Sequence, residues 1–428
     1  MDDLLIIGAG PGGYETAIEA AKRGLKVTII NDGPLGGVCL NEGCIPTKTF
    51  CHYAGTEPFE KVAERKEAVV KQLQNGVAYL LKNPNITIVE GKASLKDVNT
   101  VVVGEMVYQA KNIIIATGSK PAKLPIPGAD SEMVLTSTDV LNLKELPKSI
   151  CVIGGGVVGL EMASYLHFYG VDVTVLEYAQ QILPNYDTEI AKRLKMILAK
   201  QGIKIETDAR VIAIDDEGFV TYQKGDNTEN VLCEKVLMAV GRIPNIDCLI
   251  LDAVNIAYSK KGIEVDNNMQ TSIPNVYAIG DVTGRMMLAH VASFQGYRAL
   301  NHIQGKADKI RFDLVPSAVF IKPEVASVGL TENQVIEKGL DYSSVKIPFG
   351  AVGKAVAMGE ADGFCKMLID KDKHQILGCH IMGVHASDLI QEVVIMMNLN
   401  VTIDEAVDII HAHPTLSEII QIVIHQSK

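Results

Sequence analysis

The sequence lacks the long apolar run that a membrane-spanning helix requires. Such a helix needs about 18 or more consecutive apolar residues, and the chain of 428 residues contains no stretch of that kind. An excess of positive charge is also missing, because 51 acidic side chains outnumber 40 basic ones and the formal net charge is −11. Nucleic acids and anionic membrane surfaces are bound by basic faces. The composition therefore predicts neither a membrane nor a nucleic acid as a partner.

Cysteine is scarce, with eight residues in the whole chain. Secreted domains that are stapled by disulfides are much richer in cysteine, so a reducing compartment is the expected location. The first residues, MDDLLIIGAGPGG, begin with acids and pass directly into an apolar run, unlike a targeting signal. We therefore expect a cytoplasmic protein. Its length allows about three domains of ~150 residues each.

A glycine-rich motif follows the first apolar run, residues 4–7. The letters GAGPGG place three glycines in a GxGxxG pattern between a predicted strand and a predicted helix, namely Gly8, Gly10 and Gly13. These glycines permit a tight turn, close approach of the backbone to a pyrophosphate, and close packing of helix on strand. The N-terminus of the helix supplies an anion site. The pattern predicts a dinucleotide-binding site.

The same motif returns after the apolar run at residues 150–153. Its glycines are Gly154, Gly156 and Gly159. In the first copy Asn31 follows Gly8 by 23 positions, and in the second Glu177 follows Gly154 by 23 positions. Glycines scattered through loops would not produce two copies with equal spacing. We therefore expect an internal repeat that binds two dinucleotides.

The two copies differ at the end of their second strand. Glu177 is placed to bind a ribose 2′-hydroxyl, and no arginine occurs in the YAQQILP that follows it. A phosphate at ~4 Å from a carboxylate would cost about 4 kcal/mol at an effective dielectric constant of ~20, so this site is expected to prefer NAD over NADP. A solvated glutamate at a strand end is the alternative. The first copy has Asn31 followed by Asp32, and either could contact a ribose.

Three other apolar runs are broken by glycine, in ATGS, AVGR and AIGD. Gly118 and Gly241 would let the backbone approach a flat or phosphorylated group. Asp281 could accept hydrogen bonds from a sugar-like hydroxyl, or act as a turn or cap residue. From Arg311 onward such motifs stop, and short strands and helices predict an α+β domain. We expect a discontinuous nucleotide domain at residues 1–146 and 268–310, a second at 147–267, and a third domain at 311–428.

Two cysteines lie close together in GGVCLNEGCIPTK. Cys39 and Cys44 have four residues between them, and Pro46 predicts that a helix begins nearby. A thiol at a helix N-terminus has a lowered pKa, and Cys44 is the better placed of the two. The pair could be a catalytic dithiol, a structural clip, or two inert buried side chains. A metal site would need a second ligand pair, and Cys51 with His52 has unsuitable spacing.

The stretch HAHPTLSE lies near the end of the chain. We expect Pro414 to begin a helix, with His413 just outside it and Glu418 about one turn in. A hydrogen bond between these two side chains would orient the imidazole and raise its basicity. A helix-capping histidine is the alternative, and His411 is assigned that role.

Taken together, these stretches resemble a known family. VCLNEGCIPTK, the two GxGxxG units, AVGRIPN, AIGD, PSAVFIKPEVASVGLTE and HAHPTLSE occur in the order found in the pyridine nucleotide-disulfide oxidoreductases. Within that family the similarity is greatest to the dihydrolipoamide dehydrogenases. The resemblance implies an α/β fold with two Rossmann-like domains, for FAD and NAD, and a C-terminal α+β dimerisation domain. It implies a homodimer without a metal centre, which oxidises dihydrolipoamide on a lipoylated protein of a multienzyme complex and reduces NAD.

The resemblance also implies roles for individual residues. Cys39 would be the interchange thiol of a redox disulfide, and Cys44 would lie against the flavin. His413 and Glu418 would form a base dyad that serves the partner subunit. Lys48 would lie near the flavin and pair with Glu161. The glycines of the first copy would bind FAD and those of the second would bind NAD; further cofactor-binding candidates are Asn31, Lys48, Gly118, Asp281, Glu177 and Gly241.

Three features depart from the family pattern. Asn31 replaces the usual ribose-binding acid, and the connection from Lys48 to a helix predicted at residues 57–81 is shorter than usual. Val157 replaces the aromatic gate of glutathione-reducing relatives. The final VIHQSK lacks the cysteine pair of a mercuric reductase, and Glu177 disfavours an NADP-dependent reductase. A reductase of another disulfide or of a metal ion, and an assembly subunit of a multienzyme complex, remain the alternatives.

Overall fold

The computed structural model describes residues 1–247 and 249–428, which divide into two units. The first unit comprises Met1–Lys123, Thr136–Lys144 and Val240–Ile310. The second comprises Leu124–Leu135, Glu145–Ala239 and Arg311–Lys428. The expected division into three domains stays a prediction.

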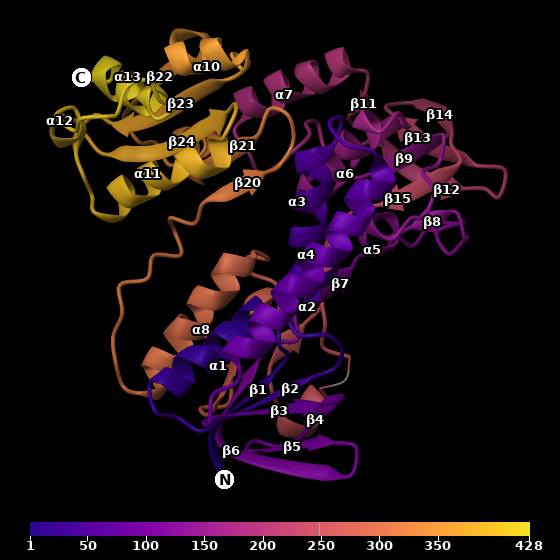
Figure 1. Ribbon diagram of the computed structural model, residues 1–428, viewed down its shortest axis with the longest axis vertical. Helices are drawn as coiled ribbons and strands as arrows, with labels where there is room; N and C mark the ends of the chain where they lie inside the picture. The colour runs from indigo at the N-terminus through magenta and orange to yellow at the C-terminus, as the bar shows by residue number, and fades with distance from the viewer. Residues whose placement is uncertain (248) are drawn as a thin grey trace. The chain divides into compact units, whose positions relative to one another are not determined.

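A parallel sheet forms the centre of the first unit (Figure 1). Strands β3 (Ile86–Glu90), β2 (Val27–Asn31), β1 (Asp2–Ile7) and β6 (Met106–Ile115) lie side by side in that order, and β19 (Val276–Ala278) also pairs with β6. An antiparallel extension continues from β6 through β5 (Thr100–Val103) and β4 (Ala93–Asp97). Parallel strands are covered on both faces, which explains why β1 and the end of β6 are continuous apolar runs.

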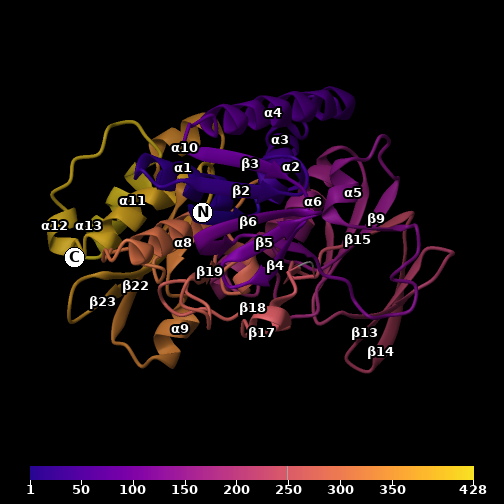
Figure 2. The same ribbon diagram turned by 90° about the horizontal axis from the view of Figure 1, so that it is seen from below.

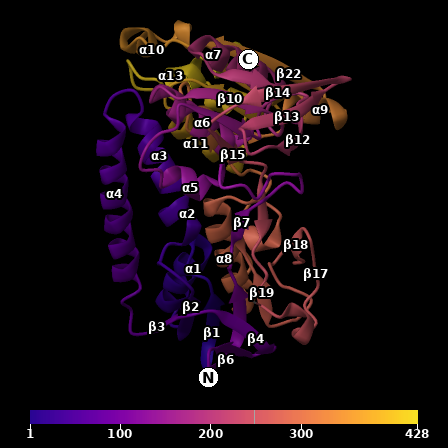
Figure 3. The same ribbon diagram turned by 90° about the vertical axis from the view of Figure 1, so that its right-hand side faces the viewer.

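Helices α1 (Pro11–Lys22) and α8 (Ala289–Ile303) pack against each other in the first unit, and Figures 1 and 3 both show them side by side. A Cβ at Gly296 of α8 would overlap Thr16 of α1, and a Cβ at Gly12 of α1 would lie 3.0 Å from the Cβ of Ala292. The two glycines therefore allow the close approach of the helices.

Three helices follow β2 in the first unit. They are α2 (Gly37–Glu42), α3 (Cys44–Tyr53) and α4 (Phe59–Leu80), and α4 contacts both of the others (Figure 2). The helix predicted at residues 57–81 is thus confirmed as α4. The smaller elements of this unit are β7 (Ser119–Pro121), α5 (Ser137–Leu141), β16 (Arg242–Pro244), η1 (Leu251–Val254), β17 (Tyr258–Ser259), β18 (Gly262–Ile263) and η2 (Gly280–Thr283).

The second unit contains a second parallel sheet. Its strands, in spatial order, are β11 (Lys204–Glu206), β10 (Asp172–Leu176), β9 (Ser149–Ile153), β15 (Lys235–Met238) and β8 (Val134–Leu135). Helix α6 (Val157–Phe168) connects β9 to β10, and α7 (Thr188–Gln201) connects β10 to β11. A three-stranded antiparallel sheet follows, formed by β12 (Arg210–Ile214), β13 (Phe219–Lys224) and β14 (Asn227–Leu232).

The C-terminal part of the second unit is an antiparallel sheet with helices. Its strand order is β20 (Ser317–Val319), β21 (Val325–Gly329), β24 (Ile376–Met382), β23 (Phe364–Asp370) and β22 (Tyr342–Pro348). The other elements are α9 (Glu332–Glu337), η3 (Phe349–Ala351), α10 (Gly353–Met358), α11 (Ala386–Asn398), α12 (Ile403–Ala406) and α13 (Glu418–Gln426). Two Rossmann-like sheets and an α+β part confirm the predicted fold class.

One predicted helix start is wrong. Helix α13 begins at Glu418, and Pro414 lies in the turn that precedes it. Glu418 is therefore in the first turn of the helix, where an acidic side chain interacts favourably with the helix dipole. Among the described residues, no helix combines the length and the apolar composition that crossing a bilayer requires.

Candidate active site

The first glycine motif forms a tight turn between β1 and α1. A Cβ at Gly8, whose φ is +107°, would overlap the carbonyl oxygen of Ala116, and a Cβ at Gly13 would overlap the carbonyl oxygen of Gly8. The N-terminus of α1 thus packs directly on the turn. Gly10 is the N-cap and has no side chain to occupy the first N–H groups of the helix. This leaves a cradle that fits a pyrophosphate.

The second glycine motif repeats this geometry in the second unit. Gly154 has a φ of +111°, and a Cβ at Gly159 would overlap the carbonyl oxygen of Gly154. The N–H of Gly154 donates to Leu176 at 2.8 Å, as the N–H of Gly8 donates to Ile30 at 2.7 Å. The internal repeat seen in the sequence is therefore a repeat of backbone structure.

The two residues at the matching strand ends make equivalent contacts. Asn31 Oδ1 accepts from the N–H of Ala9 at 2.9 Å, and Glu177 Oε2 accepts from the N–H of Gly155 at 2.5 Å. The second oxygen of Glu177 accepts from the N–H of Ala179 at 2.7 Å. A carboxylate has about four acceptor positions, so Glu177 can still accept from a ribose hydroxyl.

Asn31 is occupied differently. Its Nδ2 donates to the carbonyl oxygen of Gly33 at 2.7 Å, and the residue is 8% exposed. The amide therefore joins Ala9, in the turn after β1, to Gly33, in the loop after β2. A carboxylate could not make both bonds because it has no donor. The contact of Asn31 or Asp32 with a ribose stays a prediction.

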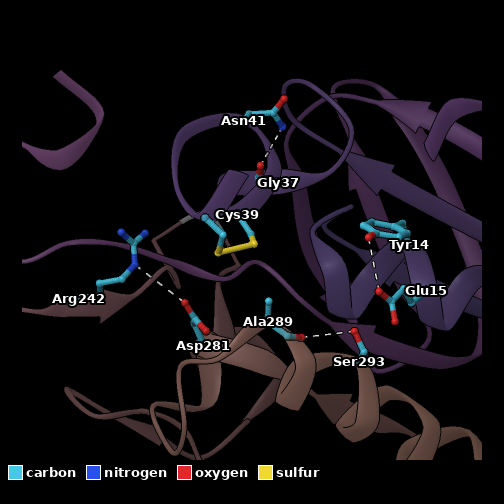
Figure 4. Close-up of a disulfide and its surroundings, with 10 residues drawn as sticks. Tyr14, Glu15, Gly37, Cys39, Asn41, Arg242, Asp281, Ala289 and Ser293 are labelled. Atoms are coloured by element: carbon cyan, nitrogen blue, oxygen red, sulfur yellow. Dashed lines mark hydrogen bonds and ion pairs between the residues drawn. A yellow bond between two sulfur atoms is a disulfide. The ribbon is translucent and has the colours of Figure 1, made fainter. Parts of the chain in front are cut away.

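Cys39 and Cys44 form a disulfide in the first unit (Figure 4). Cys39 lies in α2 and Cys44 is the first residue of α3, with Cα atoms 4.8 Å apart, within the usual range. Gly43 joins the helices, and a Cβ there would lie 3.1 Å from the carbonyl oxygen of Val38. The prediction that a helix begins near Pro46, with Cys44 better placed at its N-terminus than Cys39, is confirmed. The dipole of α3 therefore favours the Cys44 thiolate once the disulfide opens.

The turn before the disulfide packs on the first glycine motif. The N–H of Gly36 donates to the carbonyl oxygen of Ala9 at 2.9 Å. A Cβ at Gly37, whose φ is +60°, would overlap the Cα of Gly10. The GG that precedes Cys39 thus brings the disulfide next to the proposed pyrophosphate cradle.

Asp281 belongs to a network that joins all three of the other glycine motifs. Ser119 Oγ donates to Asp281 Oδ2 at 2.5 Å, and Arg242 Nε donates to Ser119 Oγ at 2.7 Å. Burial lowers the pKa of Arg242, although the nearby Asp281 carboxylate opposes this shift. Figure 4 shows the sulfur atoms of the disulfide pointing toward the segment that carries Asp281.

The sequence pattern missed the roles of Ser119 and Arg242. Each of them directly follows a candidate glycine, Gly118 in ATGS and Gly241 in AVGR, which is the signal that could have found them. The N–H of Asn245 donates to the carbonyl oxygen of Gly118 at 2.9 Å, so these two motifs lie together. The network holds Asp281 in one orientation.

Lys48 and Glu161 lie in different units. Lys48 is in α3, one helical turn after Cys44. Glu161 is in α6, is 2% exposed, and accepts from the N–H of Phe320 at 2.9 Å. Their predicted pairing stays a prediction.

The predicted hydrogen bond between His413 and Glu418 is present. His413 Nδ1 lies 2.9 Å from Glu418 Oε1, and the N–H of Thr415 donates to Glu418 Oε2 at 2.9 Å. The hydrogen bond from His413, followed by that from Thr415, lowers the pKa of Glu418. The His413 side chain is 78% exposed. Because Glu418 engages Nδ1, Nε2 is the nitrogen that can take a proton from outside.

His411 was expected to cap a helix, and this prediction is wrong. Its Nε2 lies 2.5 Å from Oε1 of Glu392 in α11, and its side chain is 6% exposed. The nearest helix start in this segment is seven residues further on, at Glu418. The pairing depends on α11, which is why HAHPTLSE alone could not predict it.

The comparisons with known proteins agree with this geometry. A family model described as pyridine nucleotide-disulphide oxidoreductase matches residues 2–296, and the dimerisation domain of the same family matches residues 315–423. The chain belongs to the pyridine nucleotide-disulphide oxidoreductases. It is therefore an oxidoreductase of a family that uses FAD and NAD(H), and the resemblance inferred from the motifs is confirmed. The dimerisation domain supports a homodimer.

Individual relatives of this oxidoreductase are similar over nearly their whole length. A dihydrolipoyl dehydrogenase of Geobacillus stearothermophilus is 41% identical over 443 aligned positions, which cover 97% of this chain and 94% of the relative. A dihydrolipoyl dehydrogenase of Bacillus subtilis is 39% identical, and the alignment covers 98% of this chain and 96% of the relative. Among solved structures, the HOCl-induced flavoprotein disulfide reductase RclA from Escherichia coli has a TM-score of 0.92, 32% identity and full coverage of both chains.

Proposed function

We propose that this oxidoreductase oxidises dihydrolipoyl groups carried by another protein and passes the electrons through FAD to NAD. The observation that carries the proposal is the contact of the disulfide turn with the first glycine motif, through Gly36 with Ala9 and Gly37 with Gly10. A disulfide held beside a dinucleotide cradle can exchange electrons with the cofactor. The dihydrolipoyl dehydrogenases among the relatives support the choice of substrate.

We assign the cofactors to the two repeats. Gly8, Gly10 and Gly13 would hold the pyrophosphate of FAD, and Asp281 its sugar-like chain. The glycines of the second motif and Glu177 would hold NAD. When bound, these cofactors supply the hydride transfer by which the electron pair of the reduced Cys39 and Cys44 passes to NAD. The domain limits given above are proposed on the same basis.

The chain's own residues carry out the thiol chemistry. His413 Nε2 takes the proton of one substrate thiol, whose sulfur attacks Cys39 and breaks the disulfide. Cys44 leaves as a thiolate, which the N-terminus of α3 stabilises. The second substrate thiol then attacks the mixed disulfide and closes the substrate ring, and its proton goes to the Cys39 sulfur that is released. Glu418 keeps the imidazole oriented through its hydrogen bond to Nδ1.

His413 and Cys39 belong to different units of the chain. We propose that His413 serves the disulfide of the second copy in a homodimer, and that Lys48 pairs with Glu161. The substrate would arrive on a lipoylated protein of a multienzyme complex in the cytoplasm.

The test is NADH formation by the purified flavoprotein supplied with dihydrolipoamide and NAD. We expect steady turnover that Cys39→Ser abolishes while flavin remains bound. Turnover that survives Cys39→Ser would remove the disulfide from the reaction.

A second candidate is NADH-driven reduction of another disulfide or of a metal ion. The similarity to RclA favours it, because a Cu(II) complex of that protein is among the matching structures, with a TM-score of 0.92. Assays with NADH and a panel of disulfides or Cu(II), beside dihydrolipoamide with NAD, separate the two. A third candidate function is that of an assembly subunit in a multienzyme complex. It requires the isolated protein to show only weak catalytic turnover.

A further inference from the structure

The segment between α12 and α13, residues 407–417, carries the proposed base His413. These residues, all of them described by the structure, belong to no helix or strand. The two flanks are anchored in the core of the C-terminal part, where Ala406 and Ile419 are buried. Between them Ile410 is 94% exposed. A group on a loop is held less precisely than one on a helix or strand, so side-chain contacts of this segment decide where His413 lies.

His411 is a side chain of this segment that points inward. It is 6% exposed, although His413, two positions later, is largely in solvent. Its Nε2 lies 2.5 Å from Oε1 of Glu392, and its Nδ1 lies 3.2 Å from the carbonyl oxygen of Ile409. Both partners are acceptors, and the protonated imidazole can donate to both at once. The ring is therefore held at both nitrogens.

Glu392 is a firm partner because its helix is part of the core. Helix α11 packs on β21 and β24. Its residues Ile390 and Val393, on either side of Glu392, are buried in the same cluster as Ile419 of α13. The Glu392 side chain itself is 32% exposed. The contact with His411 thus ties the exposed segment to a helix whose position is fixed by packing.

Further contacts continue from His411 to the base. Ala412 lies between the two histidines, and its carbonyl oxygen accepts from Thr415 Oγ1 at 2.7 Å. The N–H of Thr415 donates to Glu418 Oε2, and Glu418 Oε1 engages His413 Nδ1, both at 2.9 Å. Glu418 therefore orients the ring of His413. The backbone that carries this ring is held by His411 on one side and by Thr415 on the other.

We propose that Glu392 and His411 are positioning residues for the base, which hold the backbone so that His413 Nε2 reaches the substrate thiol. This inference rests on the proposed function, because it requires His413 to take the proton of that thiol. A general base works within hydrogen-bond reach of the proton, and a misplacement of ~1 Å can lower the rate about a hundredfold. Loss of the contact is therefore expected to slow only the step that uses the base.

The experiment separates the two half-reactions of the purified flavoprotein in Glu392→Ala. Stopped-flow absorbance follows reduction of the enzyme by dihydrolipoamide, which uses the base, and reduction of the flavin by NADH, which does not. We expect the first rate to fall by about tenfold to a hundredfold and the second to stay as in the wild type. An unchanged first rate, or an equal loss in both, would overturn the proposal.

The conservative and the matched control variants lie in the same helix. Glu392→Gln keeps an acceptor for His411 Nε2 and is expected to retain most of the first rate. Asp388 lies one turn before Glu392 in α11 and also pairs with a histidine, since His385 Nδ1 lies 3.2 Å from Asp388 Oδ2. We expect Asp388→Ala to behave as the wild type. A loss in Asp388→Ala as large as that in Glu392→Ala would overturn the proposal.

A chemical readout of the contact does not depend on turnover. Diethyl pyrocarbonate modifies accessible imidazoles, and mass spectrometry maps the modified positions. We expect His411 to react about tenfold or more faster in Glu392→Ala than in the wild type, because the ring loses its charge-assisted hydrogen bond. The exposed His385 should react equally in both proteins. A rate for His411 that Glu392→Ala leaves unchanged would overturn the proposal.

His411→Ala removes the same contact from the other side. It gives the same kinetic test if Glu392→Ala does not fold, which flavin content reports. The double variant should be no slower than either single variant, because the two residues act through one contact, and losses that multiply would overturn the proposal. The proposed function has its own test, since it fails if His413→Gln keeps its turnover. This inference fails alone if His413→Gln loses turnover and Glu392→Ala does not.

Discussion

The preference for NAD gives a quantitative test of the second glycine motif. Glu177 is 9% exposed, and both of its carboxylate oxygens accept backbone N–H groups, so the charge has a fixed position. A 2′-phosphate at ~4 Å from this charge would be repelled by about 4 kcal/mol at an effective dielectric constant of ~20, which is roughly a thousandfold in affinity. Glu177→Gln keeps the shape of the side chain and removes the charge.

We expect Glu177→Gln to raise the ratio of kcat/KM for NADPH to that for NADH by between roughly tenfold and a thousandfold. The lower figure allows for solvent screening and for the backbone N–H groups, which already share the charge. The assay compares the two reduced nucleotides with lipoamide as acceptor, at one ionic strength.

The matched control is the same position in the first repeat. Asn31→Asp places a carboxylate beside the N–H of Ala9, where Asn31 Oδ1 now accepts at 2.9 Å, and removes the donation to Gly33. We expect flavin binding to change while the NADPH-to-NADH ratio stays as in the wild type. An unchanged ratio in Glu177→Gln, or a changed ratio in Asn31→Asp, would refute the assignment of NAD to the second motif.

Three further substitutions test the disulfide and its base. The two-electron-reduced wild type is expected to show a long-wavelength charge-transfer absorbance, and Cys44→Ser should abolish both this absorbance and dihydrolipoamide turnover. The control Cys51→Ser should retain both. Absorbance retained in Cys44→Ser would contradict the assignment of Cys44 to the flavin. His413→Gln should lower kcat by about 10² to 10⁴ with flavin still bound, as expected for loss of a general base, and near-normal turnover would exclude it. Gly37→Ala should weaken flavin retention because its Cβ would overlap Gly10. Gly24→Ala is the control, since Gly24 also has a positive φ of +84° but no atom within 4 Å of an added Cβ, so equal flavin loss in both would refute the contact.

Local sterics explain why so much of the fold was predictable. Gly8 is required because the carbonyl oxygen of Ala116 occupies the place of a Cβ, and Gly154 has a φ of +111°, which other residues rarely adopt. The sequence shows both constraints because each motif consists of a few adjacent residues. The buried parallel strands are continuous apolar runs, which periodicity detects directly. The start of α3 at Cys44 followed from the nearby glycine and proline for the same reason.

Contacts between distant segments could not be predicted in this way. The network of Ser119, Arg242 and Asp281 joins positions up to 162 residues apart in sequence. His411 pairs with Glu392 of α11, 19 residues earlier in the sequence, and does not cap a helix as the sequence predicted. Pro414 was a misleading signal, because proline is compatible with a helix start and equally with the turn that precedes one.

The sequence alone determined the two dinucleotide motifs, the disulfide partners as a candidate pair, and the hydrogen bond between His413 and Glu418, because each depends on residues a few positions apart. Only the tertiary structure decided which groups these motifs meet. It placed the disulfide turn on the first glycine motif. It also distinguished the joined pair Cys39 and Cys44 from Cys365 and Cys379, which are fully buried with their sulfur atoms 3.7 Å apart. The reactivity of a thiol depends on access and on nearby donors, which distant segments supply when the chain folds.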